Sequence, residues 1–156
     1  MNKRALKNHL KYIVPEYKLA LIKESGIEPK VIRTPDDVER VLEPLKHYAE
    51  EHFVSLHLDG KHQVVGYQIV SRGTLTASLV HPREVYKAAI LSNSFALIVA
   101  HNHPAGSLKP SAEDIETTET LIKAGKILGV SLLDHLVVSS NGFTSIREER
   151  PDLWSP

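Results

Sequence analysis

One short run of apolar residues constrains the fold of this chain more than any other feature. The run extends from Phe95 to Ala100 and is apolar at every position rather than at alternate positions. A strand of this kind must be covered on both faces, because a strand with one face in water alternates apolar and polar residues. The run therefore predicts the central strand of a sheet that lies between layers of helices.

The segments around this strand alternate between strand patterns and helix patterns. Strands are expected at 53–58, 63–71, 74–80 and 132–140, helices at 34–51, 83–91 and 111–128, and turns at Asp59-Gly60 and Asn141-Gly142. An initial hairpin is followed by helices that separate the later strands. We therefore expect an α/β fold in three layers, with a mixed sheet flanked by helices.

A chain of 156 residues is long enough for one domain that folds without a disulfide or a structural metal. We expect that domain over residues 31–147. Residues 1–30 are basic and are predicted to be irregular, as a solvated arm or a frayed helix. Residues 148–156 form a polar tail that we expect to be loosely held.

The composition excludes several classes of protein. The chain has no Cys, so iron-sulfur clusters, thiolate zinc fingers and cysteine nucleophiles are impossible, and any metal must be held by His, Asp or Glu. Lys and Arg number 19, as do Asp and Glu, which argues against tight nonspecific binding to nucleic acid. No apolar run is long enough to cross a bilayer. We expect a soluble, cytoplasmic protein with no membrane partner.

The end of the predicted central strand carries the residues with the clearest chemistry. In an extended backbone His101 and His103 point to the same side, roughly 6.5 Å apart along the chain, while Asn102 points away. Pro104 favours the extended conformation for His103. The following loop can return Asp114 to the same place. Two nitrogens, one carboxylate oxygen and an open fourth position describe a catalytic zinc site.

Simpler interpretations of the same residues stay open. Ser111 and Asp114 are spaced as in a helix capping box, which needs no metal. Two histidines at the end of a strand can also be ordinary polar loop residues. The coincidence of the two patterns, one after a buried strand and one at the start of the next helix, favours the metal site.

These residues carry a family resemblance. His-x-His-Pro, six residues and Ser-x-x-Asp resemble the metal motif of the JAB/MPN (JAMM) metallopeptidases. The sequences over 71–85 and 98–106 are similar to the RadC-type branch of that family. The resemblance covers roughly residues 36–145. The helix-hairpin-helix module often attached to RadC-type proteins, DNA repair protein homologues by name, is not expected in residues 1–30.

The resemblance implies a cytidine-deaminase-like α/β fold and one Zn²⁺ per chain. Its ligands would be His101, His103 and Asp114, and a water molecule would complete the tetrahedron. Ser111 would stabilise the oxyanion of a tetrahedral intermediate. The implied reaction is hydrolysis of a peptide or isopeptide bond in a peptide or protein substrate.

The sequence departs from the family pattern at one position. The family has a catalytic Glu on an earlier strand, and alignment on Gly73-Thr74 places Gln68 at or within a residue of it. A glutamine can orient a water molecule but cannot accept its proton near neutral pH. Gln68 is natural in a branch that binds without cleaving, or is an engineered inactivating change, or another acid, such as Glu84 or Asp134, replaces the Glu.

Three functions follow as hypotheses. The first is a zinc-dependent hydrolase of the RadC-like type, impaired by Gln68. The second is a catalytically silent module that binds a peptide or protein segment by strand addition. The third is an accessory role in DNA repair, which the zero net charge of the chain does not support.

Overall fold

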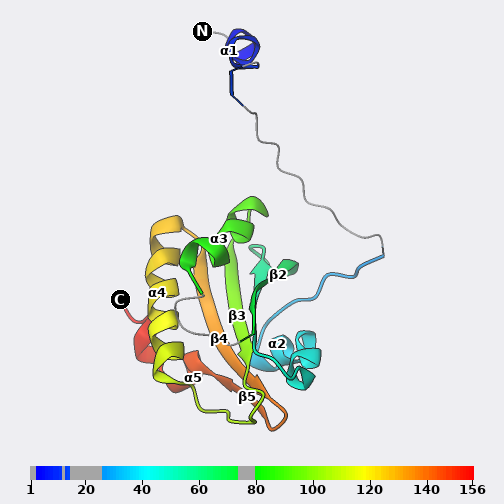
Figure 1. The fold of residues 1–156 in the computed structure, drawn as a ribbon, viewed down its shortest axis with the longest axis vertical. Coiled ribbons are helices and arrows are strands. Elements are labelled where there is room, and N and C mark those ends of the chain that lie inside the picture. The colour runs from blue at the N-terminus through cyan, green and yellow to red at the C-terminus, as the bar shows by residue number, and fades with distance from the viewer. Residues whose placement is uncertain (1–2, 12, 15–25, 74–79) are drawn as a thin grey trace.

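The computed structural model describes residues 3–11, 13–14, 26–73 and 80–156 (Figure 1). In chain order the elements are α1 (Lys3–Leu10), α2 (Pro35–Val41), the 3-10 helix η1 (Glu43–His47), β1 (His52–Leu58), β2 (Val64–Arg72), α3 (Pro82–Leu91), β3 (Ala96–Asn102), α4 (Ala112–Leu128), β4 (Ser131–Ser139), β5 (Gly142–Ser145), α5 (Ile146–Glu149) and the 3-10 helix η3 (Pro151–Trp154).

The five strands form one mixed sheet in the order β2-β1-β3-β4-β5. β3 lies at its centre, antiparallel to β1 and parallel to β4. All seven residues of β3 are buried, which confirms the prediction of a central strand covered on both faces. Phe95, the first residue of the predicted apolar run, lies just before β3, and its side chain is 59% exposed.

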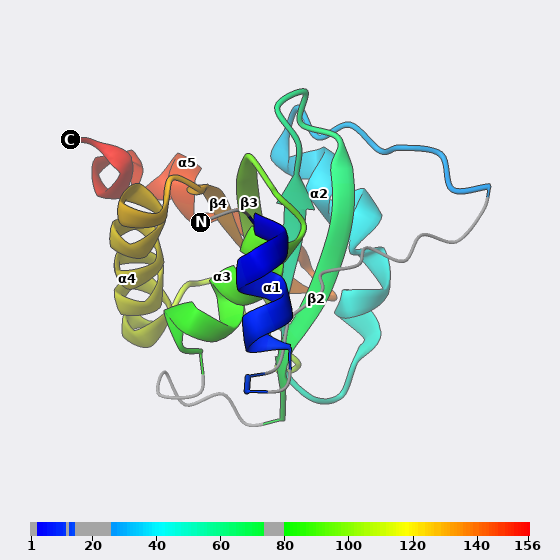
Figure 2. The same cartoon turned by 90° about the horizontal axis from the view of Figure 1, so that it is seen from above.

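Helices cover both faces of the sheet, so the predicted three-layer α/β fold is confirmed. Figure 2 shows α3 and α4 on one side of the sheet and α2 on the other. On the α3/α4 side the core contains Phe53, Val80, Val85, Tyr86, Ala89, Leu97, Val99, Leu121, Ile122, Val130 and Leu132. On the α2 side it contains Ile32, Val38, Leu45, Val54, Leu56, Leu58, Ile98, Ala100, Leu136 and Val138.

The helix predicted over 34–51 is shorter than expected. The Thr34 hydroxyl and the Asp37 carboxylate form a capping box at its start, but α2 ends at Val41, and η1 follows. Pro44 explains the break, because proline has no N–H for the helical hydrogen bond and disfavours helical geometry in the residue before it. The prediction of one continuous helix was therefore wrong.

The C-terminal residues are docked, in contrast to the loosely held tail expected from the sequence. The Trp154 indole N–H donates to the Leu132 carbonyl at 2.7 Å, and Leu153 and Trp154 pack against the core on the α3/α4 side. The Arg147 guanidinium lies over the Trp154 ring, 5.6 Å from its centroid. The polar composition of residues 148–156 suggested a loose tail, but the Trp154 side chain packs against the core and holds the segment against β4.

The N-terminal segment was expected to be a solvated arm or a frayed helix. A short helix, α1, spans Lys3–Leu10, where good helix formers predominate. The strand predicted over 74–80 falls almost entirely on residues 74–79, which lie outside the described residues. Among the helices of the described residues, none is both long enough and apolar enough to cross a bilayer.

Candidate metal centre

The end of β3 delivers two imidazole rings to the same point. His101 pairs with Phe53 of β1, and its side chain therefore lies on the α3/α4 side of the sheet. The His103 N–H donates to the Val138 carbonyl at 2.8 Å, which extends the pairing with β4 beyond the end of β3. The Nε2 atoms of the two rings are 2.9 Å apart, as expected for residues at i and i+2 of an extended chain.

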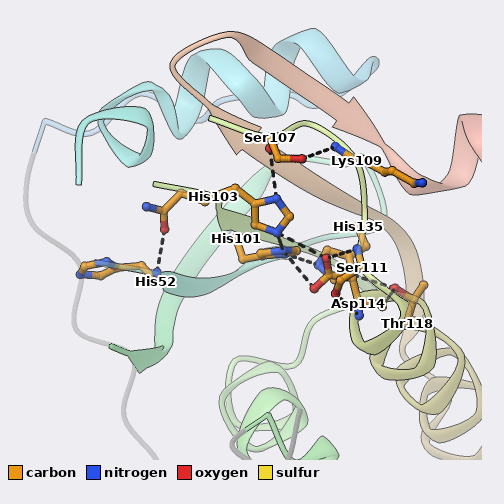
Figure 3. Close-up of polar contacts among 10 residues, drawn as sticks. His52, His101, His103, Ser107, Lys109, Ser111, Asp114, Thr118 and His135 are labelled. Atoms are coloured by element: carbon orange, nitrogen blue, oxygen red, sulfur yellow. Dashed lines mark hydrogen bonds and ion pairs between the residues drawn. The ribbon is translucent and has the colours of Figure 1, made fainter. Parts of the chain in front are cut away.

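Asp114 reaches the same point from the first turn of α4 (Figure 3). One carboxylate oxygen is 3.1 Å from His101 Nε2, and the other is 3.4 Å from His103 Nε2. The three residues form a group whose ligand atoms all lie within 4.8 Å of one another. The structure thus brings together the three side chains that the sequence analysis named as metal ligands.

These distances fit a small tetrahedral ion. Zinc–nitrogen bonds of 2.0–2.1 Å place neighbouring ligand atoms of a tetrahedron about 3.3 Å apart. The observed separations between the ligand atoms are 2.9, 3.1 and 3.4 Å. Two imidazoles and one carboxylate are also a usual donor set for a catalytic zinc. The residues present could therefore hold a metal ion.

The hydrogen bond on the far side of His103 prepares its Nε2 as a ligand. His103 Nδ1 lies 3.1 Å from the Ser107 carbonyl oxygen, which can only accept, so Nδ1 carries a proton. In the neutral ring Nε2 then keeps its lone pair, directed at Asp114. Carbonyl and carboxylate partners of this kind orient metal-binding histidines.

Electrostatics at the site reflect the close approach of the rings and the carboxylate. The hydrogen bond with Asp114 raises the pKa of His103, and the Glu51 carboxylate adds a smaller effect in the same direction. Burial opposes ionisation of Asp114, but its close contacts with the His101 and His103 rings hold the pKa of Asp114 well below its usual range. Without a metal, His103 thus tends to hold a proton that a cation would replace.

Ser111 occupies the N-cap of α4 and adjoins the ligand group. Its hydroxyl accepts from the Asp114 N–H at 3.1 Å, and its own N–H donates to Asp114 Oδ2 at 2.7 Å. Both partners of a capping box are present, so the structural interpretation of this motif holds. The same bonds fix the Asp114 carboxylate beside the two histidines. Because the hydroxyl accepts in the cap, its hydrogen can still be donated to a ligand.

Asn102, between the two histidines, has a different task on the opposite face of the sheet. Its carbonyl oxygen accepts from the His52 N–H at 2.7 Å. Its amide donates to the carbonyls of Tyr48 and Glu50 at 3.2 and 3.0 Å. These bonds tie the segment before β1 to the end of β3. The alternation of residues along β3 therefore places the Asn102 hydrogen bonds on one face of the sheet and the candidate metal ligands on the other.

Gln68 does not belong to the ligand group. It pairs with Ser55 of β1, which pairs with Val99 of β3, so its side chain lies on the same sheet face as His101 but two strands away. Its Oε1 atom is buried and has no hydrogen-bond partner among the described residues. The position thus presents an amide oxygen, and no carboxylate, to this side of the sheet.

The two acids considered as substitutes for a catalytic Glu are engaged elsewhere. Asp134 pairs with Ile98 and faces the α2 side of the sheet, opposite to His101. Glu84 lies on the surface of α3, where its carboxylate is 2.7 Å from the Lys87 ammonium. The structure therefore contradicts the hypothesis that Asp134 replaces the Glu, and it gives Glu84 a surface ion pair.

His135 lies beside the ligands on β4. Its Nε2 is 2.8 Å from His101 Nδ1, and its Nδ1 is 2.7 Å from the Thr118 hydroxyl. The sequence analysis missed Thr118, although its spacing was informative. Thr118 follows Asp114 by four residues, and residues so spaced share one face of a helix.

The comparisons with known proteins agree with this geometry. The model of the RadC-like JAB domain family matches residues 32–151. The chain belongs to the RadC-like JAB domain family. The resemblance predicted from His-x-His-Pro and Ser-x-x-Asp is therefore confirmed. In this RadC-like JAB domain, the sheet and helices present a His-His-Asp group that could bind a metal.

Relatives occur in bacteria and archaea. A UPF0758 protein of Halalkalibacterium halodurans is 48% identical over 120 residues, which cover 76% of this chain and 52% of the relative. One of Methanosarcina mazei is 43% identical over 124 residues, 78% of this chain and 54% of the relative. One of Symbiobacterium thermophilum is 52% identical over 104 residues, 67% of this chain and 44% of the relative. The chain spans about half the length of these relatives.

Proposed function

We propose that this RadC-like JAB domain binds one Zn²⁺ through His101, His103 and Asp114, and that it hydrolyses peptide or isopeptide bonds slowly. The convergence of two imidazole nitrogens and one carboxylate supports the metal site. Membership of the JAB family supports the reaction class. A peptide or protein segment is the proposed substrate.

The metal ion and Ser111 would have different roles in hydrolysis. When bound, Zn²⁺ acts as a Lewis acid that polarises a carbonyl and makes a water molecule more acidic. The Ser111 hydroxyl would donate a hydrogen bond to the substrate oxygen on which negative charge develops. The Ser111 oxygen accepts from the Asp114 N–H, so the hydrogen of the Ser111 hydroxyl is available for the substrate.

Gln68 would limit the rate. Its buried Oε1 can accept a hydrogen bond and so orient a water molecule, but an amide does not take up a proton near neutral pH. General-base catalysis contributes about 10²–10⁴ to a rate, and a chain that lacks it should be slower by that factor. We therefore expect a zinc-loaded domain with weak activity.

Metal analysis of the purified chain tests the first half of the proposal. We expect about one zinc per chain in the wild type and almost none in His101→Ala. His47→Ala is the matched control, because His47 is exposed and pairs with Glu43 on the surface. Absence of zinc from the wild type after incubation with excess Zn²⁺ would contradict the metal site.

A gain-of-function variant tests the second half. Gln68→Glu should raise zinc-dependent cleavage of a panel of peptides and isopeptide-linked peptides by about 10²–10⁴. Gln63→Glu introduces the same change in the hairpin before β2 and should have no effect. A Gln68→Glu chain that retains zinc and cleaves nothing in the panel would contradict the hydrolase proposal.

A peptide-binding module without catalysis is the second candidate function, and the amide at position 68 favours it. β2 is an edge strand of the sheet, with Tyr67 and Ile69 exposed on it. An edge strand can pair with an extended peptide through its backbone. This function predicts peptide binding that persists when a chelator removes the metal, whereas the hydrolase predicts loss of cleavage.

A further inference from the structure

His135 is completely buried, yet both of its ring nitrogens have partners. It extends from β4 towards α4 and has 0% exposed surface. Its Nε2 contacts His101 Nδ1 at 2.8 Å, and its Nδ1 contacts the Thr118 hydroxyl at 2.7 Å (Figure 3). The Thr118 hydroxyl lies in turn 2.6 Å from the backbone carbonyl of Asp114. A chain of three hydrogen bonds thus runs from one metal ligand to another.

The direction of every bond in this chain can be deduced from its end. The Asp114 carbonyl oxygen can only accept, so the single hydroxyl hydrogen of Thr118 points to it. The Thr118 oxygen must then accept from the other side, which requires a proton on His135 Nδ1. The position of the proton on His135 is therefore set by a backbone carbonyl of the helix that carries the third ligand.

The same reasoning continues to His101. His135 has no exposed surface, and its two ring nitrogens contact a hydroxyl and another imidazole rather than a carboxylate, so its ring is buried in the neutral form. A neutral ring with a proton on Nδ1 has a lone pair on Nε2. His135 Nε2 must therefore accept, and His101 Nδ1 must donate. His101 Nε2, 3.1 Å from Asp114 Oδ1, is then the atom that keeps a lone pair in the neutral ring.

We propose that Thr118 and His135 are positioning residues that hold His101 in the tautomer whose Nε2 binds the metal. The proposal rests on the proposed metal site. His103 is oriented by a single bond to the Ser107 carbonyl, whereas His101 lies deeper and needs two intermediaries. Outer partners of metal-binding histidines typically change metal affinity by about 10–100-fold, and we expect an effect of that size here.

The state of the rings is tested without metal by nitrogen-15 NMR of the histidines in the full chain at pH 8. In the wild type, His135 and His101 should both carry their proton on Nδ1. Thr118→Val keeps the shape of the side chain but removes the hydroxyl, so the His135 proton should redistribute between its nitrogens, and the His101 signals should change with it. Thr118→Ser restores the hydroxyl and should restore the wild-type spectrum.

Zinc affinity, measured by competition with a chelator, tests the consequence. Thr118→Val should bind zinc about 10–100-fold more weakly than the wild type, and Thr118→Ser within about threefold of it. Thr120→Val is the matched control, because the Thr120 hydroxyl makes the same bond to a carbonyl four residues earlier but is exposed. It should leave both the spectrum and the affinity unchanged.

The outcomes separate this proposal from the proposed function. Zinc binding by Thr118→Val at wild-type affinity, with unchanged His101 signals, would overturn the positioning role and leave the metal site intact. A wild-type chain that binds no zinc but shows the hydroxyl-dependent tautomer would overturn the metal site and support the assigned bond directions. Loss of affinity in Thr120→Val as well would attribute the effect to the helix and overturn the positioning role.

Discussion

Two neighbouring residues of β4 anchor two very different polar clusters on opposite faces of the sheet. On the α2 side, the Asp134 carboxylate accepts from the Ser145 hydroxyl at 2.7 Å and from the backbone N–H groups of His135 and Arg147 at 2.7 and 3.2 Å. On the α4 side, His135 adjoins His101, and the ligand atoms of His101, His103 and Asp114 converge.

The difference lies in the balance of donors and acceptors. The Asp134 cluster combines one acceptor group with three donors and is complete as it stands, which is typical of a structural site. The histidine cluster directs two nitrogen lone pairs and a carboxylate at one point, an arrangement that a cation stabilises. A cluster of buried polar residues therefore indicates a cation-binding site when the atoms that meet are all acceptors, and a structural role when each acceptor already has its donors.

The largest expected effect is on metal binding and separates the two clusters. His103→Ala removes one of three ligands and should weaken zinc binding by about 1,000-fold, roughly a third of the binding free energy of a structural zinc. Asp134→Asn should leave one zinc per chain, because Asp134 faces the other side of the sheet. Zinc content and competition titrations measure both. Loss of zinc in Asp134→Asn would remove the distinction between the faces.

The second prediction concerns the Asp134 cluster and measures the stability of the fold instead of metal binding. Asp134→Ala leaves two buried donors and the part-buried Arg147 N–H without an acceptor and should lower the free energy of unfolding by about 3 kcal/mol in urea titrations. Zinc should still bind to the folded fraction. Asp152→Ala, which removes a carboxylate of an exposed ion pair with Arg150, is the control and should leave the unfolding midpoint unchanged. An equally stable Asp134→Ala chain would show that the cluster is not structural.

A third variant disturbs only the side of the sheet that carries the candidate metal ligands. A Cβ atom at Gly125 of α4 would lie 2.5 Å from both the Tyr86 hydroxyl and the Val130 carbonyl, so α4 must shift. Gly125→Ala should destabilise the chain by about 2 kcal/mol, despite the better helix propensity of alanine, and should weaken zinc binding. Lys123→Ala, at an exposed position of the same helix, is the control. Unchanged stability would mean that α4 tolerates movement.

Acid should lower the free energy of unfolding, because His57 and His135 are buried in their neutral forms on the α4 side of the sheet. Burial lowers the pKa of His57 and His135 below the ordinary value of 6.5. Below pH 6.5 the unfolded chain then binds more protons than the folded chain, so this stability is complete above pH 6.5 and is lost as the pH falls. For His135 the expected slope is about 1.4 kcal/mol per pH unit.

The effect of His135 is best measured in a variant that lacks His103, because His103 changes stability with pH in the opposite direction. The raised pKa of His103 contributes stability below pH 6.5 that is lost as the pH rises through its folded value, the reverse of His135. Urea unfolding of His103→Ala between pH 5.0 and 6.5 removes this contribution, and adding His57→Gln should reduce the remaining slope. A stability independent of pH in the His103→Ala chain would contradict neutral burial of His135.

Local patterns predicted most of the fold and the three residues that could hold a metal ion. The uniform apolar run predicted the central strand, and the spacing of His101 and His103 predicted rings on one side, because both depend only on the alternation of a strand. The break after α2 was missed because the apolar spacing continued past Pro44. The docking of Trp154 was missed because the composition of the tail does not reveal a partner on β4.

The candidate site was only partly predictable for a related reason. The Ser-x-x-Asp spacing left capping and metal binding as alternatives, and the structure shows that one set of bonds is compatible with both. Neighbouring residues of a strand face opposite sides of the sheet, but which side Asp134 and His135 each face depends on the pairing of β4 with β3. That pairing excluded Asp134 from the site and placed His135 in it.

By itself the sequence determined the elements and the chemistry available to this protein. The periodicity of apolar residues set the layers, and the absence of cysteine limited metal ligands to nitrogen and oxygen. Only the tertiary structure decided which polar groups meet. The contact between Thr118, His135 and His101 joins α4, β4 and β3, and its bond directions depend on a backbone carbonyl of α4. Contacts between distant segments depend on strand register and helix packing, which no local pattern specifies.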